Sequence, residues 1–292
     1  MTDDTEKRVS VSGPSHLERV DAAVLDATGA TTIDGDVTVD EADLSGATEI
    51  GGALLAERLD ASGSVEVDAN ATVETADLSG STAIDGDLTA GEISTSGSLT
   101  VGQRLAVETL RSSGAIEATE IEGEELETSG SVVAESIAVK SLESRGRVES
   151  EELSGETMTL AGVVQADSVT ADRFTLDLTG SSTGPSLRLS AADSRIEQVR
   201  ADTVRVGSED DGGFLDISLG SIGADGRLEA EVIEGETVEI ADTTVEELYA
   251  TEATLGKGVE VAHLYAQEWE ASDDATVGEA HDVDREQGPG PK

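Results

Sequence analysis

The stretch Gly29–Gly46 reads GATTIDGDVTVDEADLSG, and its features recur along most of the chain at an almost constant interval. Its word Ile33-Asp34-Gly35-Asp36 returns 51 residues later as Ile84-Asp85-Gly86-Asp87. Glycines form one column, spaced by 17 residues and later by 16, at Gly29, Gly46, Gly63, Gly80, Gly97, Gly114, Gly130, Gly146 and Gly162. A fixed period indicates a structural unit that buries its apolar face only by stacking on copies of itself.

Aliphatic residues occupy fixed positions between the glycines. The position four residues after each glycine holds Ile33, Ile50, Val67, Ile84 and Val101, and further columns begin at Val37, Val39 and Ala42. Within each half of the unit, apolar residues alternate with Asp, Glu, Thr and Ser, which is the pattern of a strand with one buried face. Gly, Asp and Ser residues mark tight turns between the halves.

The length of the unit selects the fold class. Seventeen residues are too few for a repeat of two helices, so the pattern predicts one coil of a β-solenoid. We therefore expect an all-β fold, a parallel β-helix with coils of 16–17 residues that continues from Val20 to Val277. Parallel crossover connections are overwhelmingly right-handed, which favours a right-handed helix.

The columns shift by one residue after Gly114, and the shorter period is then kept. Two shifted columns are Ile121, Ile137, Leu153 and Val169, and Leu126, Leu142, Met158 and Phe174. A slip of one residue inside a strand would turn its apolar face outward. We therefore expect that the residue was lost from a turn.

The regularity of the pattern varies along the chain. It predicts five segments, which are a flexible leader at 1–19, regular coils at 20–178, coils with extruded loops at 179–227, C-terminal coils at 228–277, and a disordered tail at 278–292. The extruded loops are expected at 180–186 and 207–213, where Gly, Ser and acidic residues interrupt the strand pattern.

The chain is strongly acidic, with a net charge of −45 from 63 acidic and 18 basic residues. At low ionic strength so many like charges repel one another, whereas molar salt shortens the screening length to about 3 Å. Acidic residues in excess, few lysines and abundant Ala, Gly, Thr and Val indicate a protein adapted to molar salt in a halophilic cytoplasm. The charge argues against binding of nucleic acid or an anionic membrane through a basic patch.

The sequence contains no cysteine, so it forms neither disulfides nor thiolate metal sites. Its first residues have no basic and apolar regions of a secretory signal, and no stretch approaches the 18 apolar residues of a membrane span. We expect a cytoplasmic protein without direct membrane insertion, which partner proteins could bring to the inner face of the membrane.

No constellation of catalytic or metal-binding residues stands out. The three histidines, His16, His263 and His281, lie in the leader, near the last coils and in the tail and lack H-x-x-H or H-E-x-x-H spacing, so we expect no metal and no cofactor. The turns Asp34-Gly35-Asp36 and Asp85-Gly86-Asp87 are expected to be solvated rather than to bind calcium. Acidic residues are so frequent that no pair is marked for glycoside hydrolysis.

The last coils hold an aromatic cluster, Tyr249, Tyr265 and Trp269. These residues either cap the core or form an end-to-end contact, because the terminal coil of a solenoid exposes an apolar surface and unpaired backbone groups. The hypothesis for such a polymer interface includes residues of the first and last regular coils: Val20, Val24, Leu25, Leu248, Tyr249, Leu264, Tyr265 and Trp269.

The passage Leu228-Glu-Ala-Glu-Val-Ile-Glu-Gly-Glu-Thr-Val-Glu-Ile240, continued by Val245-Glu-Glu-Leu-Tyr-Ala250 and Leu255-Gly-Lys-Gly-Val-Glu-Val261, resembles the coil register of the bactofilins. These are polymer-forming cytoskeletal proteins with haloarchaeal relatives called halofilins. The resemblance implies a right-handed β-helix that polymerises end to end without nucleotide. The chain is long for a bactofilin domain and lacks the short apolar membrane-targeting leader of many members.

Three interpretations of function remain open at the level of sequence. The first is a cytoskeletal filament subunit whose main partner is itself and which has no enzymatic activity. The second is a monomeric scaffold that binds partner proteins through the loops at 180–186 and 207–213. The third is a β-helix enzyme, but the six-residue period and catalytic histidine of acyltransferases and the basic, aromatic cleft of polysaccharide lyases are not found.

Overall fold

The computed structural model describes residues 7–178, 194–207 and 226–282, and every regular element in these ranges is a β-strand. Neighbouring strands pair in parallel, with one coil of the chain between the two partners. The all-β solenoid with coils of about 16–17 residues, predicted from the repeat, is confirmed.

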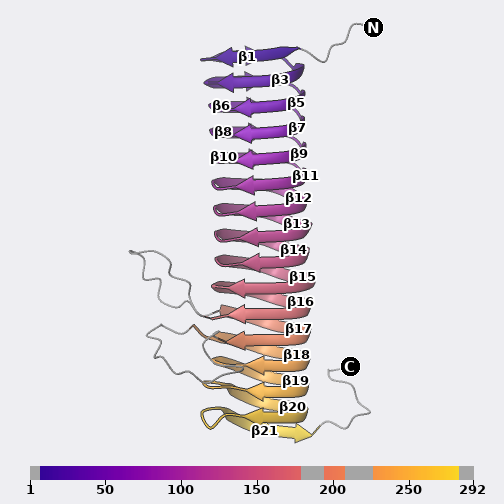
Figure 1. The fold of residues 1–292 in the computed structure, drawn as a ribbon, viewed down its shortest axis with the longest axis vertical. Helices are drawn as coiled ribbons and strands as arrows, with labels where there is room; N and C mark the ends of the chain where they lie inside the picture. Colours follow the sequence, from indigo (N-terminus) through magenta and orange to yellow (C-terminus); the bar gives the residue numbers. More distant parts are fainter. Residues whose placement is uncertain (1–6, 179–193, 208–225, 283–292) are drawn as a thin grey trace, which may run out of the picture. The chain divides into compact units, whose positions relative to one another are not determined.

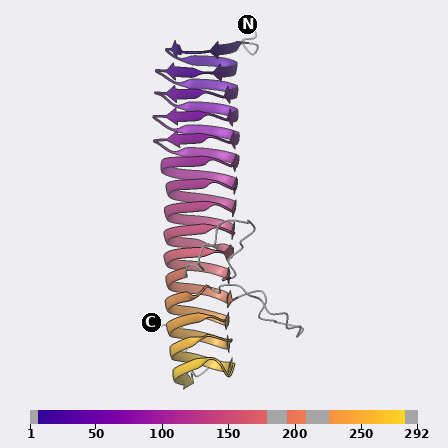
Figure 2. The ribbon, with the colours of Figure 1, turned by 90° about the vertical axis from the view of Figure 1, so that its left-hand side faces the viewer.

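The chain divides into two compact units, residues 1–139 and residues 140–292. In each unit, successive coils lie side by side (Figure 1), and the ribbon turns back once per coil (Figure 2). The handedness of the coils and one continuous helix from Val20 to Val277 stay predictions.

The first unit starts with coils of two strands each, one of about four residues and one of eight, separated by a turn. Its strands are β1 (Arg8–Ser12), β2 (Ser15–Leu17), β3 (Val20–Thr28), β4 (Ala30–Ile33), β5 (Val37–Leu44), β6 (Ala47–Ile50), β7 (Leu54–Ala61), β8 (Ser64–Val67), β9 (Ala71–Leu78), β10 (Ser81–Ile84), β11 (Leu88–Thr95), β12 (Ser98–Ser112) and β13 (Ala115–Thr128). The short and the long strands form separate parallel ladders.

From β12 onward each coil is one long bent strand. The remaining strands are β14 (Ser131–Ser144), which begins in the first unit and ends in the second, and β15 (Arg147–Ala161), β16 (Val163–Asp177), β17 (Ser194–Gly207), β18 (Leu228–Ile240), β19 (Thr243–Leu255), β20 (Glu260–Ala271) and β21 (Thr276–Asp282) of the second unit. The strands from β15 to β21 pair in chain order.

The predicted apolar columns form the interior of the coils. The first column pairs residue on residue, and each of its members is at most 2% exposed: Ile33, Ile50, Val67, Ile84 and Val101. The shifted columns are buried as well, including Met158 and Phe174, which pair with each other. In each column, an aliphatic side chain generally packs on the apolar side chain at the same position of the next coil, and this fills the narrow interior without large voids. Few large aromatic rings fit such an interior, which explains why they are scarce.

The change of period falls at a corner. Val101 pairs with Ala118, 17 residues later, whereas Arg104 pairs with Glu120, 16 residues later. The same corner is the turn Asp85-Gly86-Asp87 in the preceding coil. The interior positions remain aligned, since Leu105 still pairs with Ile121. The prediction that the residue was lost from a turn is confirmed.

The acidic turns have a structural function. Asp36 Oδ1 accepts a hydrogen bond from the backbone N–H of Ala53 at 3.0 Å, and Asp87 Oδ1 accepts one from Arg104 at 3.2 Å. Between them in the chain, Asn70 Oδ1 accepts from the N–H of Asp87 at 3.0 Å. Each side chain thus satisfies a backbone donor of the next coil at a corner where strand pairing is interrupted.

Two predicted boundaries need correction. Within the expected leader at 1–19, β1 pairs with β3 and β2 pairs with β4, so residues 8–17 belong to the solenoid. Alternation at Val9 and Val11 continues the strand pattern in front of Val20, the predicted start of the coils. Similarly, β21 extends five residues into the expected tail, to Asp282.

Other predicted segments fall wholly or mainly outside the described residues. These are residues 1–6 of the leader, the loop at 180–186, nearly all of the loop at 207–213, and residues 283–292 of the tail. Of the segment at 179–227, the part that the structure describes is mainly β17, whose Ile196, Val199, Val204 and Val206 are buried.

Candidate functional site

The residues predicted to form a polymer interface lie in two different environments. Four of them, Val20 and Leu25 in β3, Leu248 in β19 and Leu264 in β20, are at most 2% exposed. Leu264 pairs with Leu248 on one side and with Ala280 on the other, so it belongs to an interior column. These four are therefore core residues, and a charge at Leu264 would disrupt the fold instead of testing an intermolecular contact.

The other four, Val24, Tyr249, Tyr265 and Trp269, are partly exposed. Val24 pairs with Arg8 of β1 and with Glu41 of β5, so strands flank it on both sides. Tyr249 and Tyr265 stack with their ring centroids 4.6 Å apart and an interplanar angle of 6°. The ring of His281 continues this stack over Tyr265, at 4.8 Å and 15°. The tyrosines thus form a column on the side of the coils and not a cap over the core.

Tyr249 has a perturbed phenol. Burial, followed by a hydrogen bond to Glu247, raises its pKa from 10.0 to about 12. The hydroxyl donates to Glu247 Oε2 at 2.8 Å, and the carboxylate charge opposes formation of a second negative charge beside it. Both effects keep the phenol neutral and make it a donor.

Trp269 lies where the last described coil leaves the core uncovered. It pairs with Ala253, which is 4% exposed and pairs in turn with the fully buried Val238. Trp269 itself is 41% exposed, because β21 pairs with β20 only as far as Ala266. Among the residues that the structure describes, an interior column thus ends on an exposed indole, and no described strand pairs with the outer edge of β21.

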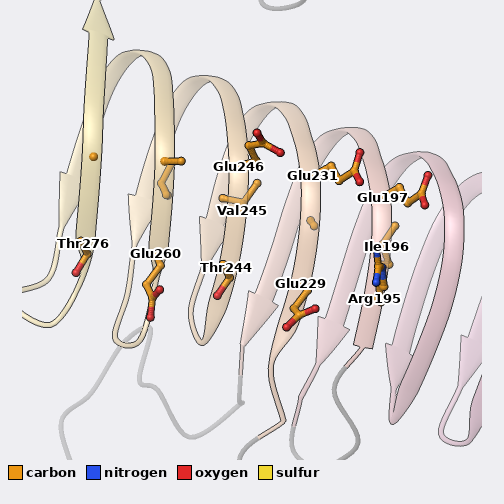
Figure 3. A pocket seen from close by; sticks show the side chains of 14 residues that line it. Arg195, Ile196, Glu197, Glu229, Glu231, Thr244, Val245, Glu246, Glu260 and Thr276 are labelled. Atoms are coloured by element: carbon orange, nitrogen blue, oxygen red, sulfur yellow. The ribbon is translucent and has the colours of Figure 1, made fainter.

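A pocket of about 630 Å³ crosses the five strands from β17 to β21. Interior residues Ile196, Val245 and Val261 line it, together with Arg195 and a set of carboxylates: Glu197, Glu229, Glu231, Glu246 and Glu260. In Figure 3, Glu197, Glu231 and Glu246 stand in a row on successive coils. The same position of successive coils thus places a carboxylate at the pocket. The lining residues include no histidine or cysteine that could act as a nucleophile or its base.

The structure brings together three residues for which no metal site is predicted from sequence. His263 on β20, and Glu279 and His281 on β21, place one possible ligand atom each within 4.8 Å of the others. Glu279 Oε2 lies 3.6 Å from His263 Nδ1 and 3.7 Å from His281 Nε2. His263 Nδ1 is buried and has no hydrogen-bond partner among the described residues.

Coil stacking, and not a local motif, builds this cluster. His263 pairs with Glu279, and Tyr265 pairs with His281, so each contact spans the 16-residue period. Motifs for metal sites usually rely on short spacings within one helix or loop. The only signal in the sequence is the spacing of one coil between His263 and Glu279, and Glu279 and His281 lie in the segment predicted to be a disordered tail.

The chain matches no family model, no curated protein and no solved structure in the three comparisons. Within the described ranges there is no helix that is long and apolar enough to cross a membrane.

Proposed function

We propose that this protein is a structural, polymer-forming subunit of the bactofilin type, without enzymatic activity, which assembles by contacts between the ends of its coil stacks and needs no nucleotide. The observation that carries the proposal is the uncovered interior column at Trp269. An exposed indole above a buried aliphatic column is an apolar surface that a second copy can cover. The resemblance of residues 228–261 to the bactofilin coil register supports the same function.

Open strand edges support assembly of this kind. The described strands leave the outer edges of β1 and β21 without a partner, and such edges present backbone donors and acceptors in a row. A second copy can satisfy these groups by adding a further coil. Each added copy then presents a new open edge, so the contact propagates into a filament and does not close into a dimer.

Assembly can be followed with the protein's own fluorescence, because Trp269 is the single tryptophan of the chain. We expect concentration-dependent filaments in molar KCl by electron microscopy and light scattering, with a blue shift of tryptophan emission as the indole becomes buried. Nucleotide should change neither signal. A monodisperse monomer over a wide concentration range would overturn the proposal and leave the scaffold interpretation.

Substitutions locate the contact. Trp269→Glu should shorten or abolish the filaments, because it places a charge on the uncovered column. Leu55→Glu is the matched control, since Leu55 is 50% exposed on β7 in the first unit, where strands β5 and β9 pair on both sides. If Leu55→Glu reduces assembly as strongly as Trp269→Glu does, the contact is not at the end of the coils.

A further inference from the structure

We propose that His263, Glu279 and His281 form a binding site for a divalent transition metal ion such as zinc. Two imidazoles and a carboxylate are a common ligand set for zinc in proteins. Imidazole ligands favour zinc, nickel and copper over magnesium and calcium, which prefer oxygen donors. In a chain with 63 acidic residues and three histidines, two histidines beside one carboxylate distinguish this place from the many acidic surfaces.

The distances suit a small ion. In a tetrahedral zinc site with bonds of about 2.0–2.1 Å, neighbouring donor atoms are about 3.3–3.4 Å apart. Glu279 Oε2 lies 3.6 Å from His263 Nδ1 and 3.7 Å from His281 Nε2. Contraction by a few tenths of an ångström therefore brings both pairs to bonding geometry, and small rotations of the rings can close the wider gap between the two imidazoles.

The unsatisfied nitrogen of His263 is an independent indication. A buried polar atom without a partner costs free energy, and most such atoms in folded proteins find one. His263 Nδ1 is buried without a hydrogen bond among the described residues, and the Glu279 oxygen at 3.6 Å is too distant for a good one. A metal ion between these two atoms would satisfy both.

The surrounding strands hold the ligands in place. His263 and Glu279 face each other across the paired strands β20 and β21, and Tyr265 stacks on the ring of His281 with centroids 4.8 Å apart. Rigid strands and a stacked aromatic ring limit the motion that metal binding must restrict. Three protein ligands leave at least one coordination position for water or for a group of another molecule.

Calorimetric titration of the chelator-treated full chain with zinc, in molar KCl near neutral pH, tests the site. We expect saturable binding of one ion per chain, while magnesium and calcium give no saturable signal because the salt screens diffuse attraction to the acidic surface. Loss of a group that merely orients a ligand costs about 10–100-fold in affinity. His263→Ala and His281→Ala should therefore each weaken zinc binding at least tenfold.

His16→Ala is the control. His16 also lies beside a carboxylate, with 3.0 Å between its Nε2 and Asp34 Oδ2, but it belongs to the first unit and not to the proposed site. Circular dichroism shows whether each variant is folded, and the absorption spectrum of bound cobalt reports nitrogen ligands in the wild-type protein without any substitution. The proposal is overturned if His16→Ala weakens zinc binding as much as His281→Ala does, if calcium competes equally with zinc, or if cobalt shows only the spectrum of the aqueous ion.

Discussion

At the scale of single residues, the most constrained positions are the glycines that mark the repeat. A Cβ added at Gly80 would lie 1.8 Å from the carbonyl oxygen of Gly63, and one at Gly97 would lie 1.8 Å from that of Gly80. Neither glycine has a positive φ, so the constraint is the close approach of neighbouring coils and not the backbone conformation. The column repeats because each glycine makes room for the next.

Gly80→Ala should therefore lower the free energy of unfolding by about 1–3 kcal/mol or more. This range is the usual cost of forcing an extra methyl group into a packed site. Gly91→Ala is a graded control, because its Cβ would lie 2.8 Å from the nearest atom, the carbonyl oxygen of Glu74. Denaturant titration in molar salt measures both. Equal losses for the two variants would contradict the role assigned to the glycine column.

Tyr249 gives a prediction about alkaline pH. Its pKa is raised to about 12 in the folded protein from 10.0, so folding favours the neutral phenol. The resulting contribution to stability is complete below about pH 10 and is lost as the pH rises through about 12.

In Tyr265→Phe, which keeps the stacked ring, Tyr249 is the single tyrosine, and its absorbance should titrate with a midpoint well above 10, lower than about 12 only by the small contribution of the Tyr265 hydroxyl. Adding Glu247→Gln should move the midpoint downward, but not fully to 10, because burial is the largest cause of the shift. A midpoint near 10 with Glu247 present would show that burial and the hydrogen bond to Glu247 do not raise the pKa of Tyr249.

At the scale of elements, the short strands of the first unit contain polar residues at core positions. Thr31 in β4, Thr48 in β6 and Thr82 in β10 are at most 3% exposed, and their hydroxyl oxygens have no hydrogen-bond partner among the described residues. Their neighbours in the same ladder include Val65 and Leu99. The strands are held by packing and backbone pairing despite these hydroxyl groups.

Replacement of such a hydroxyl by a methyl group should stabilise the coil. We expect Thr82→Val to raise the free energy of unfolding by about 1 kcal/mol, since it removes a buried group that lacks a partner at nearly constant shape. Thr89→Val, at an exposed position of β11, is the matched control and should change stability by less than about 0.5 kcal/mol. Destabilisation by Thr82→Val would reveal a hydrogen bond at this hydroxyl.

The strands could be predicted largely from sequence because every coil of the solenoid repeats the same arrangement of strands and turns. Ile33 and Ile50 occupy the same position in successive coils, so their spacing alone gave the register. The ends were harder to predict, since a terminal coil has only one neighbour to fix its pattern. The cluster of His263, Glu279 and His281 is hard to predict for a different reason, because pairing between coils, and not the local sequence, brings these residues together.

At the scale of the whole molecule, the charge of −45 is distributed so that like charges meet in ladders. Glu197, Glu231 and Glu246 follow one another on neighbouring paired strands, about 4.8 Å apart along the ladder. Some ion pairs offset this repulsion, such as Arg200 with Glu234 at 2.9 Å and Arg205 with Glu239 at 3.0 Å. With 63 acidic and 18 basic residues, most carboxylates have to be screened by solvent cations.

We expect the melting temperature to be lower in dilute buffer than in molar KCl by more than roughly 4 °C, the shift that about 1–2 kcal/mol produces in a chain of this size. Glu231→Gln, in the middle of the ladder, should narrow this difference, whereas sucrose should not substitute for salt. Equal melting temperatures at the two salt concentrations would argue against an adaptation to high salt.

The glycine column also determines how such a protein can change in length. Within the first unit, each coil pairs only with the coil before it and the coil after it, in the same register every time. Removing or duplicating one complete repeat joins surfaces that are already complementary, whereas any other insertion must be confined to a corner. The length of such a protein therefore changes in steps of one whole coil, and the number of coils can evolve without a change in how neighbouring coils pack.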